Sequence, residues 1–191
     1  MSIFITYTLD ALVAKKQHRQ AAINQQQAPT ALKAAIEALR VMEIKIGQDY
    51  GINQKEYAET LAQTLLIINQ ADGNHQALEA VQSAAKGHQL ALQFWQCDRT
   101  IGYKQMHQCR DKALTSVFGK YPQIKAQALA AVEGENRPSI STGLDKEAVL
   151  QAIWNQTSSE TSTAIQTISK TTTTQQLSSI FGGNQQRTLY Q

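Results

Sequence analysis

The stretch NHQALEAVQSAAKGHQLALQFWQ, residues 74–96, decides the fold of this chain. Its seam positions recur at intervals of three and four residues, which is the spacing of one face of an α-helix. These positions are Leu78, Val81, Ala85, His88, Leu92 and Trp95, and Leu90 and Phe94 widen the stripe. Asn74 precedes the first of them and is a typical N-cap. The stretch predicts a long amphipathic helix, in which His88 is expected to be a hydrogen-bonded core histidine.

Helical patterns also precede this stretch. A first helix is predicted from about Leu9 to Gln27, and a second begins behind Pro29, a residue that favours the first turn of a helix. The second helix carries apolar residues at heptad spacing: Leu32, Ala35, Leu39, Met42 and Ile46. Asn53 and Glu56 then have the spacing of a capping box, with Asn in place of the usual Ser or Thr. The helix that they begin has one apolar face, formed by Tyr57, Leu61, Leu65 and Ile68.

Helical patterns continue toward the C-terminus. Gly102 interrupts the pattern, which then resumes and ends near Gly119 and Pro122, and a short helix follows. Asp145 is positioned to cap a last helix that extends to about Asn155. Long helices joined by short connections predict an all-α fold, an antiparallel bundle of about five to seven helices with a Ser/Thr/Gln-rich C-terminal segment.

The composition agrees with an α-helical protein. The 191 residues include 26 Gln and 25 Ala, residue types that suit helices, while aromatic residues make up only 6%. A chain of this length is expected to form one domain, with or without an appendage. The clearest linker is GENRPSISTG, residues 134–143, which combines Gly, Pro and Ser with few apolar residues. We therefore predict a helical bundle at 1–133, a linker at 134–143, and a C-terminal helix with a low-charge segment at 144–191.

Charge and hydropathy limit the expected partners and locations. The net charge of +3 neither requires nor excludes a nucleic-acid partner. No stretch approaches the roughly 18 consecutive apolar residues of a transmembrane helix, so no transmembrane segment is predicted. The first residues, MSIFITYTLDALVAKK, lack the features of a Sec signal peptide. Two cysteines fit a reducing compartment, so the default expectation is cytoplasmic, with signal-independent secretion or incorporation into a virion as alternatives.

The densest group of reactive side chains lies in WQCDRTIGYKQMHQCRD, residues 95–111. Cys97, His107 and Cys109 allow a Cys/His hydrolase or a metalloprotein as an alternative function. The spacing is unfavourable, because the two cysteines would lie about 18 Å apart on a continuous helix unless the chain bends tightly at Gly102. We therefore predict that both cysteines are small apolar residues of packed helix faces. Nucleophile-elbow, phosphate-loop and dinucleotide motifs are absent from the sequence, so no catalytic residue, metal ligand or cofactor is predicted and an enzymatic function is disfavoured.

Basic residues support another alternative, a helical module that binds nucleic acid or a different polyanion. The first predicted helix carries Lys15, Lys16 and Arg19. A second basic group follows later in the chain: Arg99, Lys104, Arg110 and Lys112. Tyr103 lies within this group and could stack on a base. The basic residues are spread over several helical faces and match no nucleic-acid motif, so a solvated helix surface is the simpler interpretation.

The C-terminal sequence QTSSETSTAIQTISKTTTTQQLSSIFGG, residues 156–183, is rich in Ser and Thr but poor in charge and proline. Freely solvated segments are usually charged or rich in proline, so this segment is unlike them. Its apolar residues recur at helical spacing: Ile165 with Ile168, and Leu177 with Ile180 beside Phe181. We predict that these residues mediate self-association or the binding of a protein partner.

In general plan the chain is similar to helical proteins that assemble, namely secreted filament or needle-tip subunits of bacterial injection machines and internal proteins of phage particles. Those proteins share a helical body rich in Gln, Ala, Ser and Thr and an amphipathic C-terminal segment that docks on a neighbour. The likeness implies a non-enzymatic assembly or partner-binding protein, such as a subunit of a bacterial secretion apparatus or of a phage particle.

Overall fold

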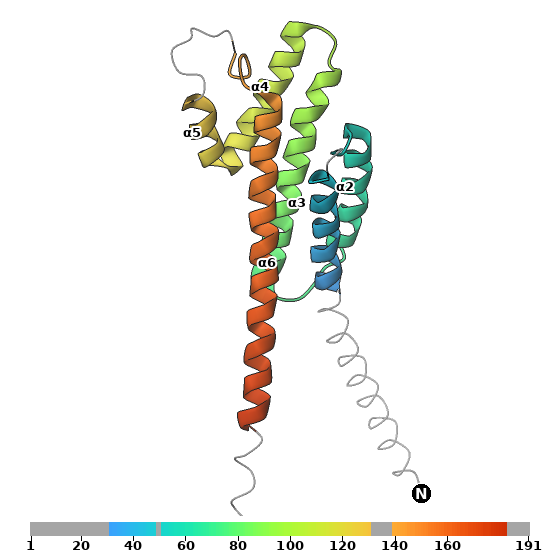
Figure 1. The fold of residues 1–191 in the computed structure, drawn as a ribbon, viewed down its shortest axis with the longest axis vertical. Helices are drawn as coiled ribbons and strands as arrows, with labels where there is room; N and C mark the ends of the chain where they lie inside the picture. The colour runs from blue at the N-terminus through green and yellow to red at the C-terminus, as the bar shows by residue number, and fades with distance from the viewer. Residues whose placement is uncertain (1–30, 49–50, 131–138, 183–191) are drawn as a thin grey trace, which may run out of the picture.

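The chain folds into a bundle of α-helices (Figure 1). The computed structural model describes residues 31–48, 51–130 and 139–182, with side chains as far as Lys170. Its elements are a helix over residues 31–46, α2 (Gln54–Ile68), α3 (His75–Gln96), the short 3-10 helix η1 (Cys97–Arg99), α4 (Tyr103–Lys120), α5 (Pro122–Ala130) and α6 (Lys146–Gly182). All regular structure in the described ranges is helical, which confirms the all-α prediction. The predicted helix from Leu9 to Gln27 lies outside the described residues.

Polar side chains begin three of the helices as the sequence predicted. The side-chain oxygens of Asn53, Asn74 and Asp145 accept hydrogen bonds of 2.9, 3.0 and 2.9 Å from backbone N–H groups in the first turns of α2, α3 and α6. Each oxygen satisfies a donor that has no partner within its own helix. The last helix begins where predicted but is longer, because it continues past Asn155 to Gly182.

The helices α3 and α6 form the central pair of the bundle. They run antiparallel along the long axis and make the most extensive contact between any two described elements (Figure 1). Figure 1 shows the 31–46 helix and α2 beside the half of α3 that is nearer its N-terminus, and α4 and α5 toward the opposite end of the molecule. The central pair therefore connects the two ends of the molecule.

Two buried clusters hold the helices together. The main core joins the 31–46 helix, through Met42, to α2, α3, α4, α5 and α6. Its largest members include Tyr57, Leu61, Phe94, Leu114, Phe118, Leu150 and Ile153. The second core joins the 31–46 helix to α2, α3 and α6, and it includes Leu32, Ile36, Leu39, Ile68, Val81 and Ala164. The predicted seam positions of the 31–46 helix and of α3 face these clusters. Apolar burial is the main favourable contribution, at about 25 cal/mol for each Å² removed from water.

The C-terminal helix packs with the helices that precede it. Residues 139–143 form a turn that leads into α6, and residues 131–138 lie outside the described part of the chain. On α6, the side chains of Val149, Leu150 and Ile153 belong to the main core, and Ala164 belongs to the second core. Residues 146–168 of the predicted C-terminal unit thus share both cores with the bundle. The division into 1–133, 134–143 and 144–191 stays a prediction.

Candidate functional site

The structure divides the predicted partner-binding residues into two groups. Ile165 and Ile168 are half-buried and pack against the second core of the same chain. Leu177, Ile180 and Phe181 lie on the last turns of α6, where the helix is described and the side chains are not. The first pair therefore contributes to this chain's own fold, and the role of all these residues in partner binding stays a prediction.

The last part of α6 extends beyond the other described helices (Figure 1). Ser83 of α3 contacts Glu160 of α6, and the two helices are antiparallel, so the start of α3 at His75 lies level with about Ile168. Residues 169–182 of α6 therefore continue for roughly 20 Å past the end of α3. In this stretch, α6 has no described helix alongside it.

A polar cluster holds α6 before it leaves the bundle. The Ser83 hydroxyl and the Lys120 ammonium donate to Glu160 Oε1 over 2.7 and 2.9 Å, and the Tyr121 hydroxyl donates to Glu160 Oε2 over 3.1 Å. Lys120 Nζ also donates to Ser83 Oγ over 2.6 Å. One carboxylate of α6 is thereby joined to α3 and to the end of α4. We call these four residues the Glu160 cluster.

The Glu160 cluster places a serine beside a lysine, as some hydrolases do, but its bonds indicate a structural role. The Lys120 ammonium is ion-paired with Glu160, and their side chains are only 18% and 23% exposed. An ammonium that is held by a carboxylate cannot act as the base that would activate Ser83. Burial, followed by the neighbouring Glu160 carboxylate, raises the pKa of Tyr121 above its usual value, so this hydroxyl stays a proton donor.

His88 is a hydrogen-bonded core histidine, as the sequence predicted. Its Nδ1 lies 2.9 Å from the Tyr57 hydroxyl, which also lies 3.2 Å from the His88 carbonyl oxygen. The Trp154 indole N–H donates to the same hydroxyl over 3.1 Å and so links α6 to α2. Burial lowers the pKa of His88 from 6.5 to about 4, and burial also raises the pKa of Tyr57, although the bond from Trp154 opposes this. Both groups are therefore neutral near neutral pH.

The structure describes four of the seven predicted polyanion-binding residues, and their role in binding stays a prediction. Lys15, Lys16 and Arg19 lie outside the described residues. Arg99, Lys104 and Lys112 are exposed, at η1 and along α4. Arg110 is not available, because its guanidinium is bonded to the Asp98 carboxylate and lies over the Phe94 ring, 5.9 Å from the centroid. Burial alone would raise the pKa of Asp98, but hydrogen bonds from Arg110 and Lys146 outweigh it and lower that pKa.

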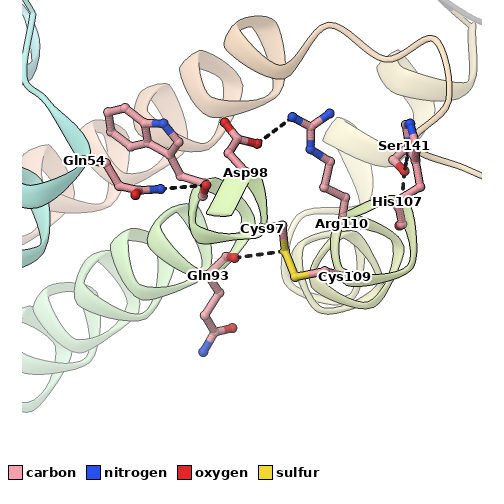
Figure 2. The surroundings of a disulfide bond; sticks show 9 residues. Gln54, Gln93, Cys97, Asp98, His107, Cys109, Arg110 and Ser141 are labelled. Carbon is pink, nitrogen blue, oxygen red and sulfur yellow. Dashed lines mark hydrogen bonds and ion pairs between the residues drawn. A yellow bond between two sulfur atoms is a disulfide. The ribbon is translucent and has the colours of Figure 1, made fainter. Parts of the chain in front are cut away.

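The prediction that the two cysteines are separate apolar residues is wrong. Cys97 and Cys109 form a disulfide, and their Cα atoms lie 5.5 Å apart (Figure 2). Their separation is small because α3 ends before Cys97 and the chain reverses at Gly102, where φ is +95°. The tight bend that the cysteines required is therefore present at Gly102, a residue type that adopts positive φ without steric cost. A disulfide removes both thiolates, so neither cysteine can serve as a nucleophile or a metal ligand in this state.

We expect the disulfide to stabilise the fold by about 3 kcal/mol, because it closes a loop between two cysteines that are 12 positions apart in the sequence. The double variant Cys97→Ser/Cys109→Ser should lose this amount in urea unfolding at neutral pH. Adding a reductant should shift the wild-type curve onto that of the variant and leave the variant unchanged. An intact mass of the oxidised protein without the expected loss of two hydrogens would contradict the disulfide itself.

α3 and α4 form a helical hairpin that turns at Gly102. A serine and a histidine also meet near this turn (Figure 2). His107 Nδ1 lies 2.8 Å from Ser141 Oγ, and both residues are buried. The Asp111 carboxylate accepts a 2.8 Å bond from the backbone N–H of Ser141, whereas the His107 ring nitrogen Nδ1 contacts the Ser141 hydroxyl. The three residues therefore lack the order of a catalytic triad, in which the carboxylate orients the histidine. Their bonds fix the turn before α6 onto α4.

Two further features bear on chemistry. A cavity of about 360 Å³ lies between α5 and the start of α6, with Gln127 and Asp145 as its polar side chains. Asp145 already accepts the N–H of Glu147 at the start of α6, so this cavity offers no free acid–base pair. Among the described residues, His, Cys, Asp and Glu side chains form no group of three that could hold a metal ion.

Comparisons with known proteins identify no relative: the chain matches no family, no curated protein and no solved structure. Within the described ranges, no helix is both long enough and apolar enough to cross a membrane. The interpretation of function therefore depends on the geometry of this chain alone.

Proposed function

We propose that this protein is a non-enzymatic helical subunit that assembles through the end of α6. The observation that carries the proposal is the extension of α6 by roughly 20 Å past α3, beyond the helices that the structure describes (Figure 1). The proposed contact surface is residues 169–182, with Leu177, Ile180 and Phe181 as the apolar positions.

The composition of this end explains why a neighbour is needed. Thr171–Thr174 are consecutive β-branched residues with low helix propensity, and Lys170 is the only ionic residue from 169 to 182. A helix of this length is marginal in water even when its residues favour helix. Packing against a neighbouring chain would supply the stabilisation that the local sequence does not.

The part of α6 that precedes the extension is bonded to three other helices. The Glu160 cluster joins α6 to α3 and α4, and the Trp154 indole joins it to Tyr57 of α2. A contact made by the extended end is thereby coupled to the rigid centre of the bundle. Membership of a bacterial secretion apparatus or of a phage particle is part of the proposal.

The disulfide bears on where such an assembly would act. Disulfides persist in oxidising environments and are rare in the cytosol. The Cys97–Cys109 bond therefore favours an assembly that functions after export from the cell or within a released particle. This proposal replaces the cytoplasmic default that the small number of cysteines suggested.

Removal of residues 171–191 should abolish assembly and leave the bundle folded. Both cores and the Glu160 cluster lie before Lys170, so the truncated chain keeps its buried contacts. Size-exclusion chromatography with light scattering should show association of the full chain and a monomer for the truncated chain. Its unfolding free energy should stay within about 0.5 kcal/mol of the full chain.

The matched control ends after Gly182, which keeps all of α6 and should still associate. A cut after Asn155 would not be informative, because it removes the buried residues Thr157, Thr161 and Ala164. The proposal fails if the full chain is monomeric at every concentration, or if the chain that ends at Lys170 associates as the full chain does.

A further inference from the structure

The turn between α3 and α4 exposes apolar side chains at the end of the molecule opposite the projecting part of α6 (Figure 1). Ile101 is 93% exposed and Tyr103 is 69% exposed, more than any other large apolar side chain of the described residues. Only Gly102 lies between them. We call residues 99–104 the hairpin apex.

The charges left at the hairpin apex are positive. Arg99 and Lys104 are exposed, and neither forms an ion pair with another residue in the described part of the chain. The carboxylate that adjoins the apex in the sequence is Asp98, which is already bonded to Arg110 and to Lys146, the latter over 3.0 Å. The apex therefore presents two cations beside two apolar side chains, without a free acid among them.

The hairpin apex is held in one shape. The disulfide joins Cys97 and Cys109 directly beneath it, and Asp98 pairs with Arg110 of α4 (Figure 2). Asp98 also pairs with Lys146 of α6. The Tyr103 ring packs edge-on against the His107 ring, 4.4 Å between centroids. Binding through the apex would therefore cost little conformational entropy, because the backbone is already ordered.

We infer that the hairpin apex docks on an anionic lipid surface. Ile101 inserts among the headgroups, Tyr103 lies at the polar boundary, and Arg99 and Lys104 contact lipid phosphates. Apolar residues next to cations are the pattern by which proteins bind at the surface of anionic bilayers. Tyrosine favours the same interface because its ring is apolar and its hydroxyl is polar.

The shape of the apex favours a bilayer over a protein partner. A stable protein interface buries about 800 Å² on each side. Six residues at a narrow turn offer much less, whereas a bilayer can accommodate a single protruding side chain. The contact is weak for one chain, and several copies in an assembly would strengthen it.

The test is co-sedimentation of the full-length, oxidised protein with phosphatidylcholine vesicles that do or do not contain phosphatidylglycerol. We expect affinity for the anionic vesicles to exceed that for the neutral ones by about tenfold or more, and to fall with added salt. Ile101→Ser should weaken it by about fivefold or more. The double variant Arg99→Gln/Lys104→Gln should weaken it by about tenfold or more.

Two control variants match these changes elsewhere on the surface. Ile44→Ser makes the same replacement at an isoleucine that is 59% exposed on the 31–46 helix. Lys33→Gln/Lys86→Gln removes the same net charge from exposed positions of the 31–46 helix and α3. Both controls should bind anionic vesicles like the wild type, and circular dichroism should show the same helix content for every variant.

Three results would overturn the inference. Failure of the wild type to bind anionic vesicles is the first. The second is an equal effect of each apex variant and its control, which would reduce the binding to general attraction between net charges. The third is binding of duplex DNA at the affinity of the anionic vesicles, weakened by the cation variant alone, which would assign the apex to nucleic acid.

Discussion

Gly87→Leu is expected to lower the free energy of unfolding by about 3 kcal/mol or more, because it overfills a close contact between α3 and α6. A Cβ atom added at Gly87 would meet the Tyr121 hydroxyl and the Thr157 methyl group inside normal van der Waals contact. A leucine would therefore separate α6 from α3 and weaken the Glu160 cluster. In thermal unfolding, the midpoint should fall by about 6–12 °C.

Gly119→Leu is the matched control. Gly119 is exposed on α4, and an added Cβ would meet no atom there, so this variant should be neutral or slightly more stable. Gly87→Ala should cost less than Gly87→Leu, and the added change Thr157→Ser should recover part of the loss because it removes the clashing methyl group. Equal stability of Gly87→Leu and Gly119→Leu would contradict the close contact of α3 with α6.

Acidification should destabilise the protein by about 3 kcal/mol between pH 6.5 and pH 4, through His88 alone. Burial lowers the pKa of His88 to about 4, whereas the unfolded histidine has a pKa near 6.5. Between these values the unfolded state binds a proton that the folded state does not, so stability falls as the pH falls. Well above pH 6.5, from about pH 7.5, His88 is neutral in both states and contributes no pH dependence.

The variant His88→Gln separates this contribution from others. Glutamine does not titrate and can still accept a hydrogen bond from the Tyr57 hydroxyl. The free energy of unfolding of His88→Gln, measured in urea from pH 7 to pH 4, should therefore fall by about 3 kcal/mol less than that of the wild type. His75→Gln, on an imidazole that is 86% exposed, should keep the wild-type slope. The Asp98 carboxylate contributes to stability at a lower pH range than His88, because its folded-state pKa is lowered from 3.8. Its contribution to the free energy of unfolding is lost as the pH falls through that lowered pKa. A wild-type slope in His88→Gln would contradict the assignment.

Much of the fold follows from local patterns, and these the sequence predicted. The seams of the 31–46 helix and of α3 depend on residues three and four apart, which lie on one face of any α-helix. The caps at Asn53, Asn74 and Asp145 depend on an oxygen within one turn of the N–H that it accepts. Such features need no knowledge of the neighbouring helices.

The Glu160 cluster and the Asp98–Arg110 pair depend on contacts between residues that are distant in the chain. Glu160 meets Ser83 and Lys120 only because α3, α4 and α6 converge, and nothing near Glu160 in the sequence indicates these partners. The sequence shows Arg110 as one of several basic residues, and only the turn at Gly102 places its guanidinium against the Asp98 carboxylate. The C-terminal sequence looked like a separate segment, yet Thr157, Thr161 and Ala164 are buried against the bundle.

The sequence by itself determined that this is a helical protein, where its described helices begin, and that His88 lies in the core. Only the tertiary structure decided that Cys97 and Cys109 form a disulfide, that Gly87 is the close contact of the central pair, and that α6 continues past the bundle. The physical reason is range. Helix formation and capping are governed by neighbours within a turn or two, whereas disulfide pairing, buried ion pairs and exposed ends are governed by which helices lie side by side.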